Sequence, residues 1–180
     1  MRHDDELRLG EWACLACVAE RPAHGFAVAA WLAPTGELGR VVALSRSLTY
    51  RALELLAARS MVEVVGEERG RNGLTRTVYG ATDRGRAALG DWLGGAVDDV
   101  TAAWPELLLK VVVHRRLGVD VAPLVERQRA VLAPMLVALE GASERGADVV
   151  DVWHDESVRA ALRFLDHVAV PSPRAHDASA

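Results

Sequence analysis

The chain has 180 residues, of which 51% are hydrophobic and 26% are charged, and its formal net charge is -4. So many apolar residues can bury a core, which excludes disorder of the whole chain, and the length fits one domain or two small ones. The net acidity argues against a protein that coats nucleic acid non-specifically, although a total charge hides local patches.

The opening residues, MRHDDELRLGEW, are acidic and lack the apolar core of a signal peptide. No apolar run reaches the roughly 20 residues that a membrane span needs. We therefore expect a cytoplasmic protein that does not cross a membrane.

The first part of the chain predicts two helices. Residues 7–19 repeat apolar side chains at helical spacing, and Arg21-Pro22 ends the pattern. A short second helix over residues 26–31 follows His24-Gly25. Residues 33–39 contain a proline and two glycines, which predicts a loop.

The stretch SRSLTYRALELLAARSMV, residues 45–62, predicts a third helix that runs to about residue 58. Either Ser45 or Ser47 can cap its first turn. The apolar stripe at three- and four-residue spacing consists of Thr49, Ala52, Leu53 and Leu56. On or near the outer face lie Arg46, Ser47, Tyr50, Arg51 and Glu54.

A β-hairpin is predicted next. Residues 61–65 are rich in valine and residues 74–79 include Thr75, Thr77 and Tyr79, as strands should. Residues 67–73 lie between them, with two glycines and the turn-forming pair Asn72-Gly73.

Helices fill the rest of the chain. A fourth starts at Thr82 or Asp83 and ends near residue 93; later helices span 106–117, with Pro105 in the first turn, 123–140 and 152–168. Gly94-Gly95 and residues 98–101 mark a break. We therefore predict a first domain over residues 1–95, a helical domain over 96–170 and a disordered tail over 171–180.

Three helices followed by a two-stranded hairpin form a winged helix-turn-helix, so the predicted fold class is mostly α with a small β-hairpin. That arrangement places its third helix in the DNA major groove and its hairpin against the backbone or minor groove. Residues 40–86 hold nine arginines against five acidic residues, a net charge of +4 that gives an acidic protein a basic segment.

Three motifs in this order resemble the PadR-like family of winged helix-turn-helix transcriptional regulators. They are EWACLACVAERPAHGFAVA with His24-Gly25-Phe26, SRSLTYRALELLAARSMV with Tyr50, Leu53 and Leu56, and TRTVYGATDRGRAALGDWL. The resemblance covers roughly residues 7–93. It implies a homodimeric transcription factor, usually a repressor, that binds a palindromic double-stranded operator and is released by a small aromatic or hydrophobic effector. It also implies dimerisation largely through the C-terminal helices, and among these we expect the last helix, residues 152–168, to form the interface.

Two groups of residues are candidates for DNA contact. Arginine can read guanine and a hydroxyl can hold a phosphate, which favours Arg46, Ser47, Tyr50 and Arg51 on the third helix. Around the turn, arginines can enter a narrow minor groove, which favours Arg69, Arg71 and Arg76. A solvated helix face and a solvated turn are the alternatives.

The resemblance implies an effector role for Trp92, Trp104 and Trp153, since some family members stack flat ligands between tryptophans; core packing is the alternative. Cys14 and Cys17 lie inside an apolar helix without further cysteines, so we expect buried side chains and no metal site. We expect His24 to be structural or to cap a helix.

The sequence contains no nucleophile elbow, phosphate loop or zinc signature, so we expect neither enzymatic activity nor a cofactor. Two other functions remain open. The winged helix could bind another protein without binding DNA, which the net acidity favours. The two cysteines could form a thiol-based sensor.

Overall fold

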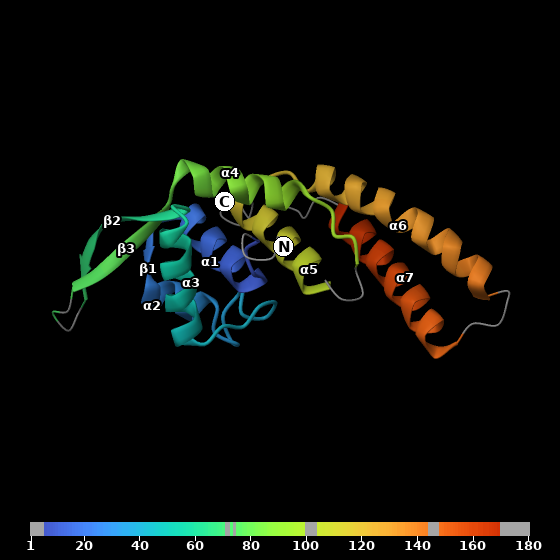
Figure 1. Cartoon of the computed structure of the whole chain (residues 1–180), viewed down its shortest axis with the longest axis horizontal. Coiled ribbons are helices and arrows are strands. Elements are labelled where there is room, and N and C mark those ends of the chain that lie inside the picture. The colour runs from blue at the N-terminus through green and yellow to red at the C-terminus, as the bar shows by residue number, and fades with distance from the viewer. Residues whose placement is uncertain (1–5, 71–72, 74, 100–103, 144–147, 170–180) are drawn as a thin grey trace, which may run out of the picture. The chain divides into compact units, whose positions relative to one another are not determined.

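The structure is a computed structural model and describes residues 6–70, 73, 75–99, 104–143 and 148–169 (Figure 1). Its elements in chain order are α1 (Leu9–Glu20), β1 (Ala23–His24), α2 (Gly25–Trp31), α3 (Arg46–Ala58), β2 (Val62–Arg69), β3 (Thr75–Ala81), α4 (Asp83–Gly94), α5 (Trp104–Leu117), α6 (Ala122–Ser143) and α7 (Val149–Ala169). The chain divides into two compact units, one of Met1–Gly94 with Leu108–Val119 and the other of Gly95–Leu107 with Asp120–Ala180.

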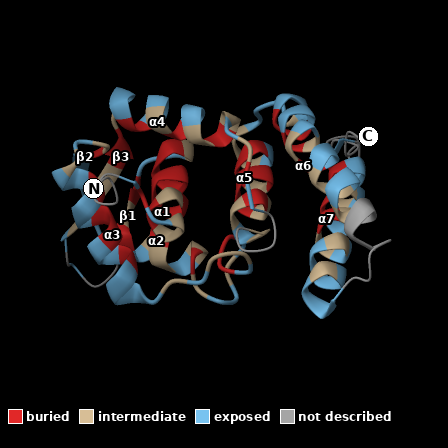
Figure 2. Ribbon diagram, turned by 45° about the vertical axis from the view of Figure 1, so that its right-hand side comes forward, coloured by how far each residue is buried: buried red, intermediate tan, exposed pale blue. Residues whose placement is uncertain are grey.

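Helix α1 is the centre of the first unit. Residues 13–19 are all buried, and α1 packs against α2, α3 and α4. Figure 2 shows buried residues along most of α1, whereas α3 and α4 each carry exposed residues along one side. Small side chains such as Ala13 and Ala16 allow the neighbouring helices to approach closely.

The strands form one antiparallel sheet in the order β1-β3-β2, with a bulge between Val64 and Gly66. Together with α1 to α3 they make the winged helix-turn-helix arrangement, so the predicted fold class is confirmed. Two details of the sheet differ from the prediction. The two-residue strand β1 was not predicted, and β2 pairs with β3 as far as Arg69 opposite Thr75, so residues 67–69 belong to the strand and not to the turn.

Helix α3 is fixed at both ends. The Ser45 hydroxyl accepts the Leu48 N–H at 3.3 Å, so Ser45 is the cap. At the other end, Ser60 adopts a left-handed conformation with φ of 55°. The Ser60 and Met61 N–H groups donate to the carbonyls of Ala57 and Leu56, which closes the helix and turns the chain into β2.

The start of α4 is packed tightly against the end of the α3–β2 connection. The Thr82 hydroxyl accepts the Gly85 N–H at 3.0 Å and lies 2.8 Å from the Ser60 carbonyl, to which it donates. A Cβ on Gly85 would lie 2.0 Å from the Met61 carbonyl oxygen. Only glycine therefore fits at this position without a shift of the backbone.

Residues 108–119 pack within the first unit, although the sequence placed them in the C-terminal domain. Arg116 of α5 donates hydrogen bonds to Glu20 of α1 and to Glu37, and its side chain is only 14% exposed. The predicted domain boundary at residues 95 and 96 stays a prediction. The predicted tail, 171–180, lies outside the described residues.

The second unit is built on α6 and α7, which pack against each other. Buried side chains recur along one stripe of α7, at Val158, Ala161, Leu165 and Val168. The buried Gln128 of α6 bonds both the N–H of Val97, at 2.7 Å, and its carbonyl, at 2.8 Å. The side-chain oxygen of Gln128 accepts one of these hydrogen bonds and its nitrogen donates the other. These partners make the burial of a polar side chain tolerable.

Candidate nucleic-acid interface

The amphipathic division of α3 creates an exposed polar surface. Thr49, Ala52, Leu53 and Leu56 are buried, as the periodicity indicated. The exposed candidates form what we term the α3 outer face: Arg46, Ser47, Tyr50 and Arg51. Their spacing and exposure leave two guanidinium groups and two hydroxyls available to a partner.

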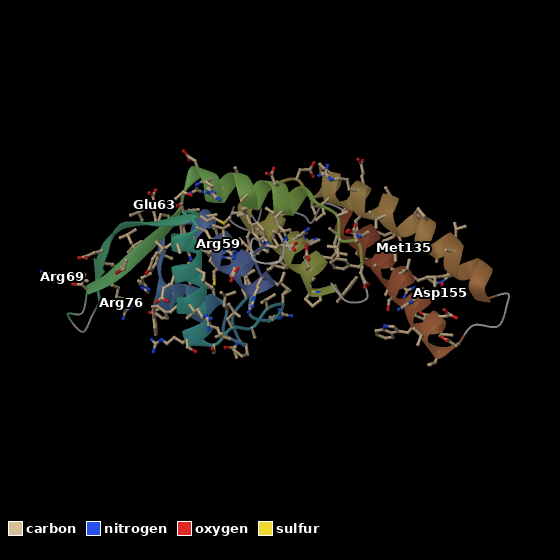
Figure 3. The ribbon with its side chains drawn as sticks, viewed as in Figure 1. Arg59, Glu63, Arg69, Arg76, Met135 and Asp155 are labelled. Atoms are coloured by element: carbon tan, nitrogen blue, oxygen red, sulfur yellow. The ribbon has the colours of Figure 1, made fainter. Side chains whose placement is uncertain are left out.

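The hairpin carries the second group of arginines. Figure 3 shows Arg69 near the free end of the hairpin and Arg76 on its lower edge, on the side of α2. Arg69 is exposed and Arg76 is half-buried, while Arg71 lies outside the described residues. The hairpin is not purely basic, because β2 also exposes three glutamates, Glu63, Glu67 and Glu68.

A hollow of about 410 Å³ separates the α3 outer face from the hairpin. Its lining includes Arg46 and Tyr50 of α3 together with Thr75, Thr77 and Tyr79, which alternate along β3. The remaining lining residues are His24, Gly25, Phe26 and Arg76. The hollow is therefore rich in hydrogen-bond donors and contains two arginines, which suits an anionic partner.

The sequence His24-Gly25-Phe26 accounts for the shape of this hollow. The Nδ1 atom of His24 accepts the Ala27 N–H at 3.0 Å and so caps α2, as expected for a structural histidine. A Cβ on Gly25 would lie 2.7 Å from the Cε1 atom of Tyr50, so glycine here leaves room for the tyrosine ring. Phe26 is 44% exposed, which is unusual for so large an apolar side chain.

Phe26 lies beneath both arginines of the hollow. The Arg46 guanidinium carbon is 4.7 Å from the centre of its ring, and the Arg76 guanidinium carbon is 5.0 Å from it. Sequence reasoning missed Phe26 and Gly25 as site residues. The motif His24-Gly25-Phe26 was recognised in the sequence, but no spacing rule predicts that the first turn of α2 contacts both α3 and the hairpin.

The three candidate tryptophans lie in different surroundings. Trp92 of α4 stacks on Trp12 of α1, with ring centres 4.9 Å apart. The rings of Trp104 and Phe164 meet in a T-shaped arrangement with their centres 5.4 Å apart, and Trp153 of α7 is 63% exposed. Trp153 and Phe164 are separated by about 16 Å along α7, so Trp104 and Trp153 of one copy do not enclose one ligand. A role in effector binding stays a prediction.

Cys14 and Cys17 are both fully buried in α1. Burial raises the pKa of the Cys17 thiol to about 12 and also raises the pKa of Cys14. A protonated thiol is a weak nucleophile and a poor metal ligand. Within the described ranges, no group of three His, Cys, Asp or Glu side chains could hold a metal ion.

We expect neither thiol of the native protein to react with a chromogenic disulfide reagent at about pH 8, because both groups are protonated and shielded from solvent. Both thiols should react once the protein is unfolded in denaturant, which provides the control. The absorbance of the thiolate that the reagent releases measures the extent of reaction. Rapid reaction of the native protein would favour the thiol-based sensor.

In the part of the chain that the structure describes, no helix is both long and apolar enough to cross a membrane.

Comparisons with solved structures found similar chains, one of which is described below beside this geometry. No protein-family model matches the chain, and no curated protein matches it. Among solved structures, the chain is similar to the "Crystal structure of Bacillus subtilis PadR in complex with operator DNA". The sequence identity is 18%, the match covers 92% of this chain and 100% of that chain, and the TM-score is 0.45.

Proposed function

We propose that this chain is a DNA-binding transcriptional regulator of the PadR-like type. The observation that carries the proposal is the placement of Arg46 and Tyr50 of the α3 outer face and of Arg76 of the hairpin around one donor-rich hollow. Arg46 and Arg51 supply positive charge on α3, and hydroxyls of Tyr50, Thr75 and Thr77 can donate to phosphate oxygens. In this proposal α3 enters the major groove and the hairpin follows the backbone.

We further propose that the regulator is a homodimeric repressor that a small aromatic or hydrophobic effector releases from a palindromic operator. Support for the dimer comes from the first turns of α7, where four large apolar side chains are exposed: Val149, Val150, Val152 and Trp153. Clustered exposed apolar side chains of this kind mark interaction surfaces. A second copy of α7 is the proposed partner of this surface.

The direct test is binding to duplex DNA from the region upstream of the chain's own gene, followed by fluorescence anisotropy as the salt concentration is varied. Binding should weaken by at least about 100-fold between about 50 and 200 mM salt, because each phosphate contact releases a counterion. A random duplex of equal length measures the non-specific part of the affinity.

A protein-binding winged helix is the second candidate. It is favoured by the net charge of -4 and by the three glutamates that β2 exposes beside its arginine. If the chain binds no DNA even at low salt, this second function is the better explanation, and the proposal of a DNA-binding regulator fails.

A further inference from the structure

Phe26 is positioned as a link between the two elements that are proposed to contact DNA. It belongs to the first turn of α2, whereas Arg46 belongs to the first turn of α3 and Arg76 to β3. Both guanidinium carbons lie within 5.0 Å of its ring centre. This distance is well inside the roughly 6 Å at which a cation is attracted to an aromatic face.

The ring is held in place from its own side of the hollow. His24 caps α2 through its Nδ1 atom and pairs with Val78 of β3, so the residues just before Phe26 are fixed to the sheet. In a neutral histidine whose Nδ1 accepts a hydrogen bond, the proton is on Nε2. Nε2 lies 3.8 Å from the Glu68 carboxylate, on the strand beside Arg76, and 3.4 Å from the Nη1 atom of Arg76 itself.

The contacts with Phe26 leave the arginines competent to bind an anion. A cation–π contact uses the positive charge and consumes none of the N–H donors of a guanidinium. Each side chain is thereby restricted in its rotamers. The donors of Arg46, and those of Arg76 other than the Nη1 atom beside His24, stay available for phosphate oxygens. Because such long side chains lose rotamer entropy when they are fixed, prior ordering reduces the entropy lost on binding.

We propose that Phe26 is a positioning residue for DNA binding, which fixes Arg46 of α3 and Arg76 of β3 relative to each other. Since both guanidinium carbons contact one ring, the two charges lie within about 10 Å of each other, which is about the rise of three base pairs along the DNA axis. Helix and hairpin then address the same short stretch of backbone. This role rests on the proposed DNA-binding function.

The test replaces Phe26 by leucine, which keeps an apolar side chain but removes the aromatic face. We expect DNA affinity to fall by about fivefold to tenfold, because two cation–π contacts no longer order the arginines. Phe26→Tyr keeps the ring and should restore the affinity to within about twofold of the original protein. In an Arg46→Ala/Arg76→Ala background, Phe26→Leu should have no further effect.

A matched control is Trp31→Leu, since Trp31 is on the same short helix and its ring contacts Arg21 at 4.8 Å, away from the hollow. Its DNA affinity should be unchanged. The proton NMR shifts of the Arg46 and Arg76 side-chain methylenes report the same contacts without DNA, and they should lose their ring-current displacement in Phe26→Leu but not in Phe26→Tyr.

Two results overturn the role of Phe26 alone: full affinity of Phe26→Leu in a protein that binds DNA, or an equal loss from Phe26→Leu when both arginines are already absent. If the unaltered protein binds no DNA at low salt, the proposed function fails and this role fails with it. Whether or not the protein binds DNA, the NMR shifts show whether the Phe26 ring orders the two arginines.

Discussion

Replacing both Arg46 and Arg51 by alanine is expected to weaken binding to the upstream DNA by about 10- to 100-fold at moderate salt. Both side chains are exposed on the α3 outer face, where they supply charge to the proposed interface. If each contacts one phosphate, the slope of log affinity against log salt should fall by about two units. Anisotropy titrations at several salt concentrations measure both quantities.

The fold and the assembly should survive this double substitution, because neither arginine belongs to the buried stripe of α3. The lost contact between Arg46 and Phe26 is at the surface and should cost only about 1 kcal/mol of stability. Thermal unfolding and size-exclusion chromatography check these points.

A matched control removes the same charge elsewhere. Arg127 of α6 and Arg163 of α7 are both exposed and belong to the second unit, so their joint replacement by alanine also lowers the charge by two. This control should bind DNA nearly as the original protein does. Equal losses in the two double variants would mean that α3 is not the DNA-contacting helix.

A large loss of stability is expected from Gly85→Ala. The added Cβ would lie 2.0 Å from the Met61 carbonyl oxygen, and this backbone atom cannot move aside as a flexible side chain could. The carbonyl also accepts the Thr82 N–H at 3.1 Å, so a shift would disturb the start of α4. We expect the free energy of unfolding to fall by about 3 kcal/mol, as in other overpacked sites.

Gly90 provides the control within the same helix. A Cβ at this exposed position would meet nothing within 4 Å. Gly90→Ala should therefore be neutral or stabilise the protein by up to about 1 kcal/mol, since alanine favours a helix more than glycine does. Urea unfolding of both variants measures the difference. Equal stabilities would show that α4 can move away from Met61 at little cost.

The sequence predicted α3 and its buried stripe well, because the signal is local. Thr49, Leu53 and Leu56 recur at helical spacing within one segment, and a serine stands where the cap is needed. The exposure of Arg46 and Arg51 follows from the same periodicity, since a helix that buries one stripe must expose the opposite one. This part of the candidate site was therefore predictable from the residues alone.

Other features depend on contacts between distant segments. Strand β1 has only two residues, and it exists because Ala23 and His24 meet Tyr79 and Val78 of β3. The end of β2 exposes Glu67, Glu68 and Arg69 on both of its faces, so no alternation of apolar and polar residues distinguishes it from a turn. The position of Phe26 beneath two arginines likewise depends on three separate elements.

The α3 outer face and the buried stripe of α3 share no residue, and this affects how the sequence can diverge in evolution. Substitutions at Arg46, Ser47, Tyr50 or Arg51 alter side chains that the hydrophobic core does not include, whereas Leu53 and Leu56 are completely enclosed by it. If α3 contacts DNA as proposed, mutational drift can therefore change which DNA sequence the helix prefers while folding is preserved. Gene duplicates of this chain could acquire new targets through a few surface codons.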